Sequence, residues 1–94
     1  MKTILLSGST WQSPDDFFSA LLPQLGAPIW HGRNLNALDD SLYGDINEVE
    51  PPFTVRVEDI ESLSAEMIAF LSEVSRVFAD ARREYGVDVA FEIV

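Results

Sequence analysis

Few side chains in this chain of 94 residues have the chemistry that catalysis requires. There is one histidine, His31, and no cysteine, which excludes thiolate nucleophiles, disulfides and cysteine-ligated zinc. His31 lies between Trp30 and Gly32 in a predicted turn, and no nucleophile accompanies it. Glycine-rich phosphate-binding loops are also missing. We therefore interpret His31 as a surface or turn residue and not as a catalytic base, and we do not expect an enzyme.

Three aspartates, Asp39, Asp40 and Asp45, have the oxygen ligands that calcium and magnesium prefer. Their spacing lacks the regular alternation and the closing glutamate of an EF-hand loop. We therefore favour solvated carboxylates over metal ligands, and we predict neither a metal nor another cofactor. An enzyme or cation-binding protein built on these three residues is the weaker alternative, which calorimetry with magnesium and calcium would test.

The chain is strongly acidic, with 16 acidic and 6 basic residues and a net charge of −10. Nucleic acids and anionic membrane surfaces are bound through cations, so we exclude both as direct partners. At 47% hydrophobic residues, the chain is too apolar to be a disordered acidic tail. A folded acidic protein attracts basic partners, and a basic protein is therefore the expected partner.

Length and composition indicate one domain over residues 1–94. A chain of this size buries one modest core without disulfides. No stretch approaches the roughly 20 apolar residues that cross a bilayer. The absence of cysteine agrees with a reducing compartment, and we predict a cytoplasmic location.

The hydrophobic pattern predicts strands and helices in alternation. The expected elements are a strand at 3–6, a helix at 14–25, a helix at 34–44, a strand at 53–57, a helical turn or short helix at 58–63, a helix at about 65–85 and a strand at 87–94. Helices separate all the strands and no tight hairpin joins them, which favours parallel strands with right-handed crossovers. We predict an α/β fold with a single small three-stranded parallel sheet, packed with three to four helices.

The second helix has two distinct faces. One apolar stripe comprises Leu35, Leu38, Leu42 and Ile46. Asn36, Asp40 and Tyr43 point outward together, and Asp39 lies on the flank of this face. A carboxylate between an amide and an aromatic ring suits recognition, since aromatic residues are enriched at binding hot spots. The stretch from Asp39 to Glu50, with five acids and no base, is otherwise typical of a solvated surface.

The remaining aromatic residues have less distinctive positions. Trp30, in the turn before this helix, fits a core residue and an exposed contact residue equally well. We interpret Trp11 as a packing residue, and we place Phe78 and Tyr85 on the core stripe of the long helix. Asp80 lies on the polar side of the same helix.

Residues 30–42 read W-H-G-R-N-L-N-A-L-D-D-S-L and resemble the signature aromatic-x-G-x-N-L-D-A-L-x-D-x-L of the barstar family of intracellular ribonuclease inhibitors. Pro28, Gly44 and the pair Pro51-Pro52 fit this family as well. Residues 77–81, V-F-A-D-A, resemble its V-F-x-acid-A on the last helix. The order of elements extends the resemblance over essentially the whole chain.

The resemblance implies a three-stranded parallel sheet with helices packed on it, and a protein that covers the active site of a small ribonuclease. The second helix and the turn before it provide the plug. Asp40 matches the central inhibitory aspartate, which takes the place of a substrate phosphate. Trp30 replaces a contact tyrosine and Asp80 a contact glutamate, and Gly32 and Asn34 match the start of the helix.

Four positions differ from the best-known member of the family. Asn36 replaces an aspartate, Asp39 and Asp45 replace tryptophans, and Tyr43 replaces a small polar residue. Because such changes alter specificity, the resemblance does not identify the target enzyme.

The resulting prediction is a monomer that forms a 1:1 complex with a basic ribonuclease or ribonuclease toxin. The alternative is an acidic adaptor for a basic partner that is not a nuclease.

Overall fold

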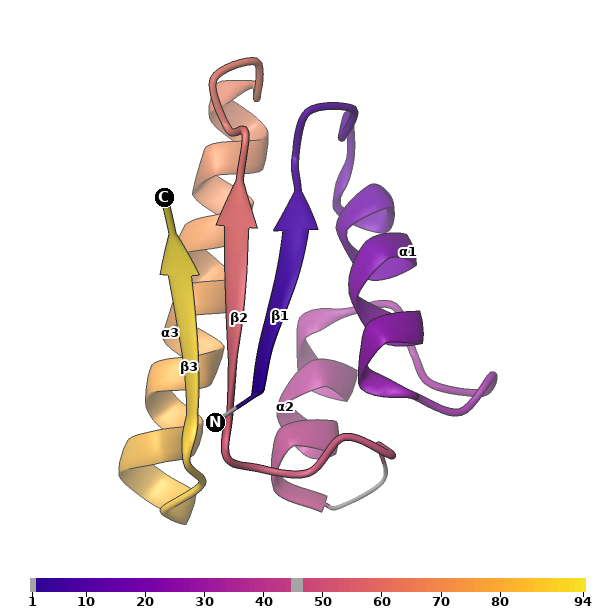
Figure 1. The fold of residues 1–94 in the computed structure, drawn as a ribbon, viewed down its shortest axis with the longest axis vertical. Coiled ribbons are helices and arrows are strands. Elements are labelled where there is room, and N and C mark those ends of the chain that lie inside the picture. Colours follow the sequence, from indigo (N-terminus) through magenta and orange to yellow (C-terminus); the bar gives the residue numbers. More distant parts are fainter. Residues whose placement is uncertain (1, 45–46) are drawn as a thin grey trace.

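The computed structural model describes residues 2–44 and 47–94, without the side chain of Tyr43. The elements follow the predicted order and comprise β1 (Lys2–Ser7), α1 (Pro14–Leu25), α2 (Leu35–Gly44), β2 (Phe53–Glu58), α3 (Ala65–Tyr85) and β3 (Val89–Ile93) (Figure 1). The predicted α/β fold is confirmed. Within the described ranges it has three helices, the lower of the two numbers expected.

The segment between β2 and α3 is a turn, so the short helix considered at 58–63 is wrong. The backbone N–H of Leu63 donates to the carbonyl of Ile60 (3.1 Å) and closes this turn. The Ser64 hydroxyl then accepts a hydrogen bond from the N–H of Met67 (3.2 Å), which starts α3. A side-chain cap of this kind satisfies a backbone donor that has no partner within the helix. The local sequence therefore favours a helix start at Ser64 and not earlier.

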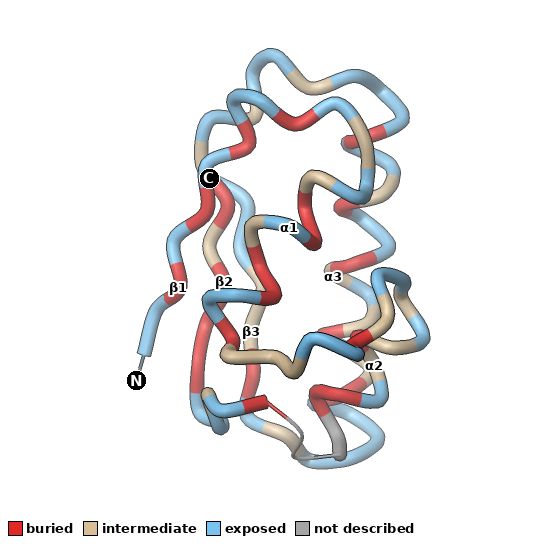
Figure 2. Tube along the Cα trace, turned by 90° about the vertical axis from the view of Figure 1, so that its right-hand side faces the viewer, coloured by how far each residue is buried: buried red, intermediate tan, exposed pale blue. Residues whose placement is uncertain are grey.

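The three strands form one parallel sheet, as predicted, and β2 lies in its centre. Ile4, Val55 and Phe91 are aligned across the sheet. Figure 2 shows the strands as one layer and the helices as the other. On β1 the side chains alternate, so Ile4 faces the helices and is buried, while Leu5 is 56% exposed on the uncovered face.

Strand β3 begins at Val89, two residues later than expected. Gly86 ends α3 in the left-handed conformation, with φ of 67°. The N–H of Val87 donates to the carbonyl of Ala81 (3.3 Å) and is part of the helix end. Val87 therefore cannot donate to the sheet, although its apolar side chain continues the alternating pattern of the strand.

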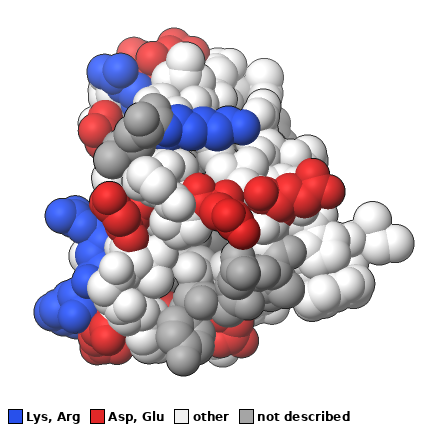
Figure 3. Space-filling model, turned by 60° about the horizontal axis from the view of Figure 1, so that its bottom comes forward, with Lys and Arg blue, Asp and Glu red and all other residues white. Residues whose placement is uncertain are grey.

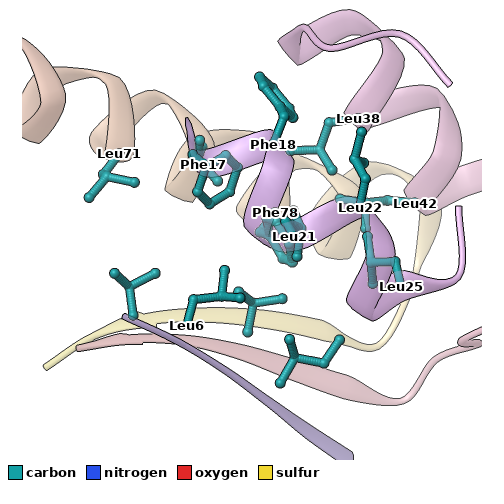
Figure 4. Packing of buried hydrophobic residues seen from close by; sticks show 14 of the residues in the cluster. Leu6, Phe17, Phe18, Leu21, Leu22, Leu25, Leu38, Leu42, Leu71 and Phe78 are labelled. Atoms are coloured by element: carbon teal, nitrogen blue, oxygen red, sulfur yellow. The ribbon is translucent and has the colours of Figure 1, made fainter. Parts of the chain in front are cut away.

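The core lies between the helices and the sheet, and Phe17 of α1 is at its centre (Figure 4). Its ring makes edge contacts with Trp11, Phe18 and Phe70 at centroid distances of 5.5, 5.3 and 5.6 Å. The packing role predicted for Trp11 is confirmed, since this residue is 7% exposed. None of the helices in the described ranges is long and apolar enough to cross a membrane.

The long helix α3 buries Phe78 but not Tyr85, which is 41% exposed. The prediction of a core position for Tyr85 is therefore wrong. Tyr85 is the last residue of α3, and this end of the helix projects beyond the sheet (Figure 1). The apolar stripe thus continues past the surface against which it packs.

Gly26 joins the end of α1 to the segment that follows α2. Its φ of 65° is in the left-handed region, and a Cβ atom here would lie 2.6 Å from the Cβ of Glu48. The N–H groups of Glu48 and Val49 donate to the carbonyls of Gly26 (3.3 Å) and Leu25 (3.0 Å). Only glycine permits both this backbone conformation and this close approach. The contact fixes one side of the loop that leads into α2.

Candidate functional site

Gly32 and Asn34, which the sequence predicted at the start of α2, shape this end of the helix. The side-chain oxygen of Asn34 accepts a hydrogen bond from the N–H of Ala37 (2.8 Å), which caps the helix. A Cβ atom on Gly32 would lie 3.0 Å from both the Ala37 Cβ and the Asn34 amide nitrogen. Gly32 therefore lets the loop pass close to the first turn of α2, and these two residues orient the helix.

Helix α2 turns one face to the core and the other to solvent. Leu38 and Leu42 are 0% and 4% exposed and belong to the core cluster. Asn36 and Asp40 are exposed, as the periodicity predicts. The Tyr43 side chain and Asp45, two further predicted contacts, lie outside the described part of the chain. The described outer face of α2 thus presents an amide and a carboxylate to solvent.

Packing of α2 against α3 brings carboxylates from both helices together. Asp39 is half-buried, and burial raises the pKa of its carboxyl above the ordinary 3.8. The neighbouring charges of Asp40, Asp80 and Glu84 raise this pKa further, in that order. The predicted residues Asp40 and Asp80 therefore both lie close enough to Asp39 to act on its charge.

Arg83 pairs with two of these carboxylates, but its single positive charge does not neutralise the group of four acids. Its guanidinium donates to Asp80 (2.6 Å) and lies 3.6 Å from Glu84. The Arg83 side chain is 70% exposed, so water and salt screen these ion pairs. Figure 3 shows the lower end of the molecule, where acidic side chains extend across the middle and basic ones lie toward the upper and left margins. This end therefore carries a surplus of negative charge.

Glu84 was not among the predicted site residues, although the sequence contains a signal for it. It follows Asp80 by four residues, which places both side chains on one face of α3. The sequence alone does not indicate that this face lies beside Asp39. That juxtaposition depends on the packing of α2 against α3.

The loop before α2 exposes its two large apolar residues. Trp30 is 69% exposed, so the core interpretation of this residue is wrong and a contact role remains. Its neighbour Ile29 is fully exposed. His31, in contrast, is buried at 7% exposure, and its Nδ1 donates to the carbonyl of Gly32 (2.6 Å). His31 is thus a buried turn residue and not the surface residue that we also considered.

Arg33 holds this loop against α1. Its guanidinium forms an ion pair with the Asp15 carboxylate (2.5 Å) and also donates to the Asp15 carbonyl (2.9 Å) and the Ser19 hydroxyl. The hydrogen bond from Arg33 holds the pKa of the Asp15 carboxyl below its ordinary value. These contacts join the loop to the first half of α1, 18 and 14 residues earlier in the chain. They stabilise the position of the loop.

An Asp39→Asn variant is expected to be more stable than the wild type at neutral pH, by less than about 1 kcal/mol. Because the pKa of Asp39 is raised in the folded state, the folded protein binds a proton more tightly than the unfolded chain does. Wild-type stability should therefore fall as the pH rises through this raised pKa. Urea unfolding at several pH values measures the difference.

The gain from Asp39→Asn should disappear as the pH approaches 3.8, where the unfolded chain also binds the proton. Glu61→Gln, in the exposed turn before α3, is the matched control for loss of one acid. Equal effects of the two variants at every pH would contradict the interaction of Asp39 with its neighbours.

Metal binding gains no support from the described residues, among which no group of three or more acidic or histidine side chains is placed to hold an ion. Asp39 and Asp40 are half-buried and exposed, respectively, on adjacent sides of α2. Asp45 lies outside the described ranges. Calorimetry with magnesium and calcium therefore remains the test of a site built on all three aspartates.

Comparison with curated proteins finds no match. Comparison with models of protein families does find one. The sequence model of the family described as Barstar (barnase inhibitor) matches residues 1–94, which is the whole chain. This match includes the capped start of α2, its exposed acidic face and the parallel sheet that supports it. The chain therefore belongs to the barstar family, whose members are inhibitors and not enzymes.

Proposed function

We propose that this protein inhibits a small basic ribonuclease by inserting the outer face of α2 into the active-site cleft. The exposed Asp40 carboxylate then takes the place of a substrate phosphate and accepts charge-assisted hydrogen bonds from cationic side chains of the enzyme. The observation that carries this proposal is the position of Asp40. It is an exposed acid on a helix fixed by its buried face, in a chain that matches the barstar family throughout.

The other predicted residues have supporting roles in this complex. Asn36 lies one turn before Asp40 and contacts the same cleft, and Tyr43 extends the contact one turn further. Asp39, Asp45 and Asp80 contribute negative charge around it. Trp30 contacts the rim of the cleft from the loop. Gly32 and Asn34 act through the orientation of α2.

The proposed complex contains one inhibitor and one ribonuclease, formed from a free inhibitor monomer inside the cell. An inhibitor kept there protects the cell's own RNA. The danger comes either from a ribonuclease that the cell makes for export or from a ribonuclease toxin of a competitor. A nuclease or toxin gene beside the inhibitor gene would distinguish these roles.

Association with the ribonuclease is expected to slow strongly as salt is added. The net charge of −10 and the acids Asp39, Asp40, Asp80 and Glu84, where α2 packs against α3, attract a cationic cleft over long distances. The barnase–barstar pair is itself the usual example of such steering. Raising the ionic strength from about 0.01 to about 1 M shortens the Debye length from about 30 to about 3 Å. Stopped-flow association rates over this range provide the measurement, and a flat response would refute steering.

The test of the proposed function is an RNA-cleavage assay with a panel of small secreted basic ribonucleases, with and without the protein. Inhibition at a 1:1 ratio is the expected result. Binding to a nuclease without inhibition, or capture of only basic non-nuclease proteins from the source cell, would favour the adaptor alternative. Inhibition of no enzyme in the panel, nor of ribonuclease activity in the source cell's own extracts, would overturn the proposal.

A further inference from the structure

The loop between α1 and α2 differs in charge from the rest of the molecule. Residues 26–34 contain no acid, although the chain as a whole has 16. Their one base, Arg33, is engaged by Asp15 and Ser19. The segment therefore has no charge with which to attract a cationic cleft. A partner surface that complements it is apolar.

The same loop is unusually apolar at its exposed positions. Ile29 is fully exposed and Trp30 is 69% exposed. In Figure 1 the loop projects to the right of α1 and α2, and the right-hand projection in Figure 3 is uncharged. Adjacent large apolar residues on such a projection are characteristic of contact sites, because their exposure to water is unfavourable.

A groove of about 420 Å³ lies between this loop and the second half of α1. It is lined by five apolar residues and three polar ones, namely Leu22, Pro23, Ala27, Pro28 and Ile29 with Ser19, His31 and Arg33. Leu22 is 8% exposed and belongs to the core, so the groove has a firm apolar floor. Its volume and its five apolar lining residues suit a large apolar side chain.

The groove is already formed in the free protein. The N–H of Ala27 donates to the carbonyl of Leu22 (3.0 Å), and the N–H of His31 donates to the carbonyl of Pro28 (3.0 Å). Arg33 anchors the far end of the loop to α1. A partner that binds here therefore avoids most of the entropy cost of ordering a loop.

We infer that Ile29 and this groove form a second, apolar contact region for the target ribonuclease. The enzyme inserts a large apolar side chain from a loop beside its active-site cleft. This inference rests on the proposed function. The contact is continuous with the proposed inhibitory face, because Trp30, Gly32 and Asn34 belong to the same loop.

The two contact regions have different tasks. The acidic face of α2 attracts any cationic cleft and sets the association rate. The apolar region has no such attraction and acts on dissociation, after the cleft is filled. It therefore selects, among ribonucleases with similar catalytic clefts, those that carry the matching apolar side chain.

The test measures association and dissociation rates at low and high salt for Ile29→Ala and Ile29→Asp. The probe is whichever secreted basic ribonuclease in the panel the wild type inhibits most strongly. Ile29→Ala should dissociate at least about tenfold faster at both salt concentrations, because three buried carbons are lost. The salt dependence of its association should equal that of the wild type. Ile29→Asp should bind more weakly still, because it buries an unpaired charge.

Leu5→Ala is the matched control, since Leu5 is an exposed apolar residue on the uncovered face of the sheet. If Ile29→Ala dissociates at the wild-type rate, the inference is overturned. The proposed function still stands in that case, provided that the wild type inhibits the ribonuclease. Tighter binding by Ile29→Asp would also overturn it, because the facing surface would then be basic. A wild type that inhibits no ribonuclease overturns both.

Two other occupants of the groove are distinguished by measurements on the free protein. Self-association in sedimentation equilibrium that is lost in Ile29→Ala would assign the groove to a second copy of the chain. Binding of the wild type, but not of Ile29→Ala, to phosphatidylcholine vesicles would assign it to a lipid surface. Either result would overturn the inference, and the expected result is a monomer that does not bind vesicles.

Discussion

An Asp40→Ala variant is expected to bind its target ribonuclease at least about 30-fold more weakly than the wild type, a loss of about 2 kcal/mol. Asp40 is exposed on the outer face of α2, whose inner face is fixed by Leu38 and Leu42. In the complex its carboxylate accepts hydrogen bonds from cationic groups that otherwise hold RNA phosphate. The alanine variant leaves those cations without a partner in a site from which water is excluded. Inhibition constants from RNA cleavage and dissociation rates measure the loss.

The role of charge at this position is separated from the role of shape by Asp40→Asn. The amide keeps the size of the side chain but replaces the anionic acceptor, so we expect it to lose most of what Asp40→Ala loses. Glu61→Ala is the matched control, because it removes one exposed acid from the turn between β2 and α3, at the opposite end of the sheet from α2 (Figure 1). This control should slow association slightly and leave dissociation unchanged. Wild-type affinity in Asp40→Ala would exclude Asp40 as the central inhibitory residue.

The fold and one face of the site could be predicted because they depend on periodic patterns. The spacing of Leu35, Leu38 and Leu42 identifies the buried side of α2, and the exposed positions of Asn36 and Asp40 follow from it. The order of strands and helices restricts the sheet to a parallel arrangement in the same way. These inferences require only local geometry and the hydrophobic effect.

The rest of the site depends on contacts between distant segments. A residue in an irregular turn has no periodicity, so the sequence does not distinguish an exposed Trp30 from a buried one. The anchoring of Arg33 joins residues 18 positions apart. The approach of Asp39 to Asp80 and Glu84 requires the packing of α2 on α3. Such juxtapositions are properties of the tertiary structure, and no single stretch of sequence contains them.

The largest effect on stability is expected for Phe17→Ala, which should lower the free energy of unfolding by about 3–5 kcal/mol. Phe17 is 0% exposed, and its ring contacts aromatic side chains from outside α1, namely Trp11, Phe70 and Phe91. Its removal leaves a cavity where the first loop, α1, α3 and β3 meet. A domain of this size has a total stability of about 5–15 kcal/mol, so the variant should be only marginally folded.

Urea unfolding followed by circular dichroism is the appropriate measurement, because Trp11 fluorescence would itself change when Phe17 is removed. Tyr85→Ala, which truncates a partly exposed aromatic residue on α3, is the control and should cost much less. A loss below about 1 kcal/mol in Phe17→Ala would contradict a central role for this ring.

The same substitution connects stability to function. Asp15 and Ser19, which hold Arg33 and the loop before α2, lie within two residues of Phe17 on α1. Loosening of α1 should therefore weaken inhibition even in the fraction of Phe17→Ala that remains folded.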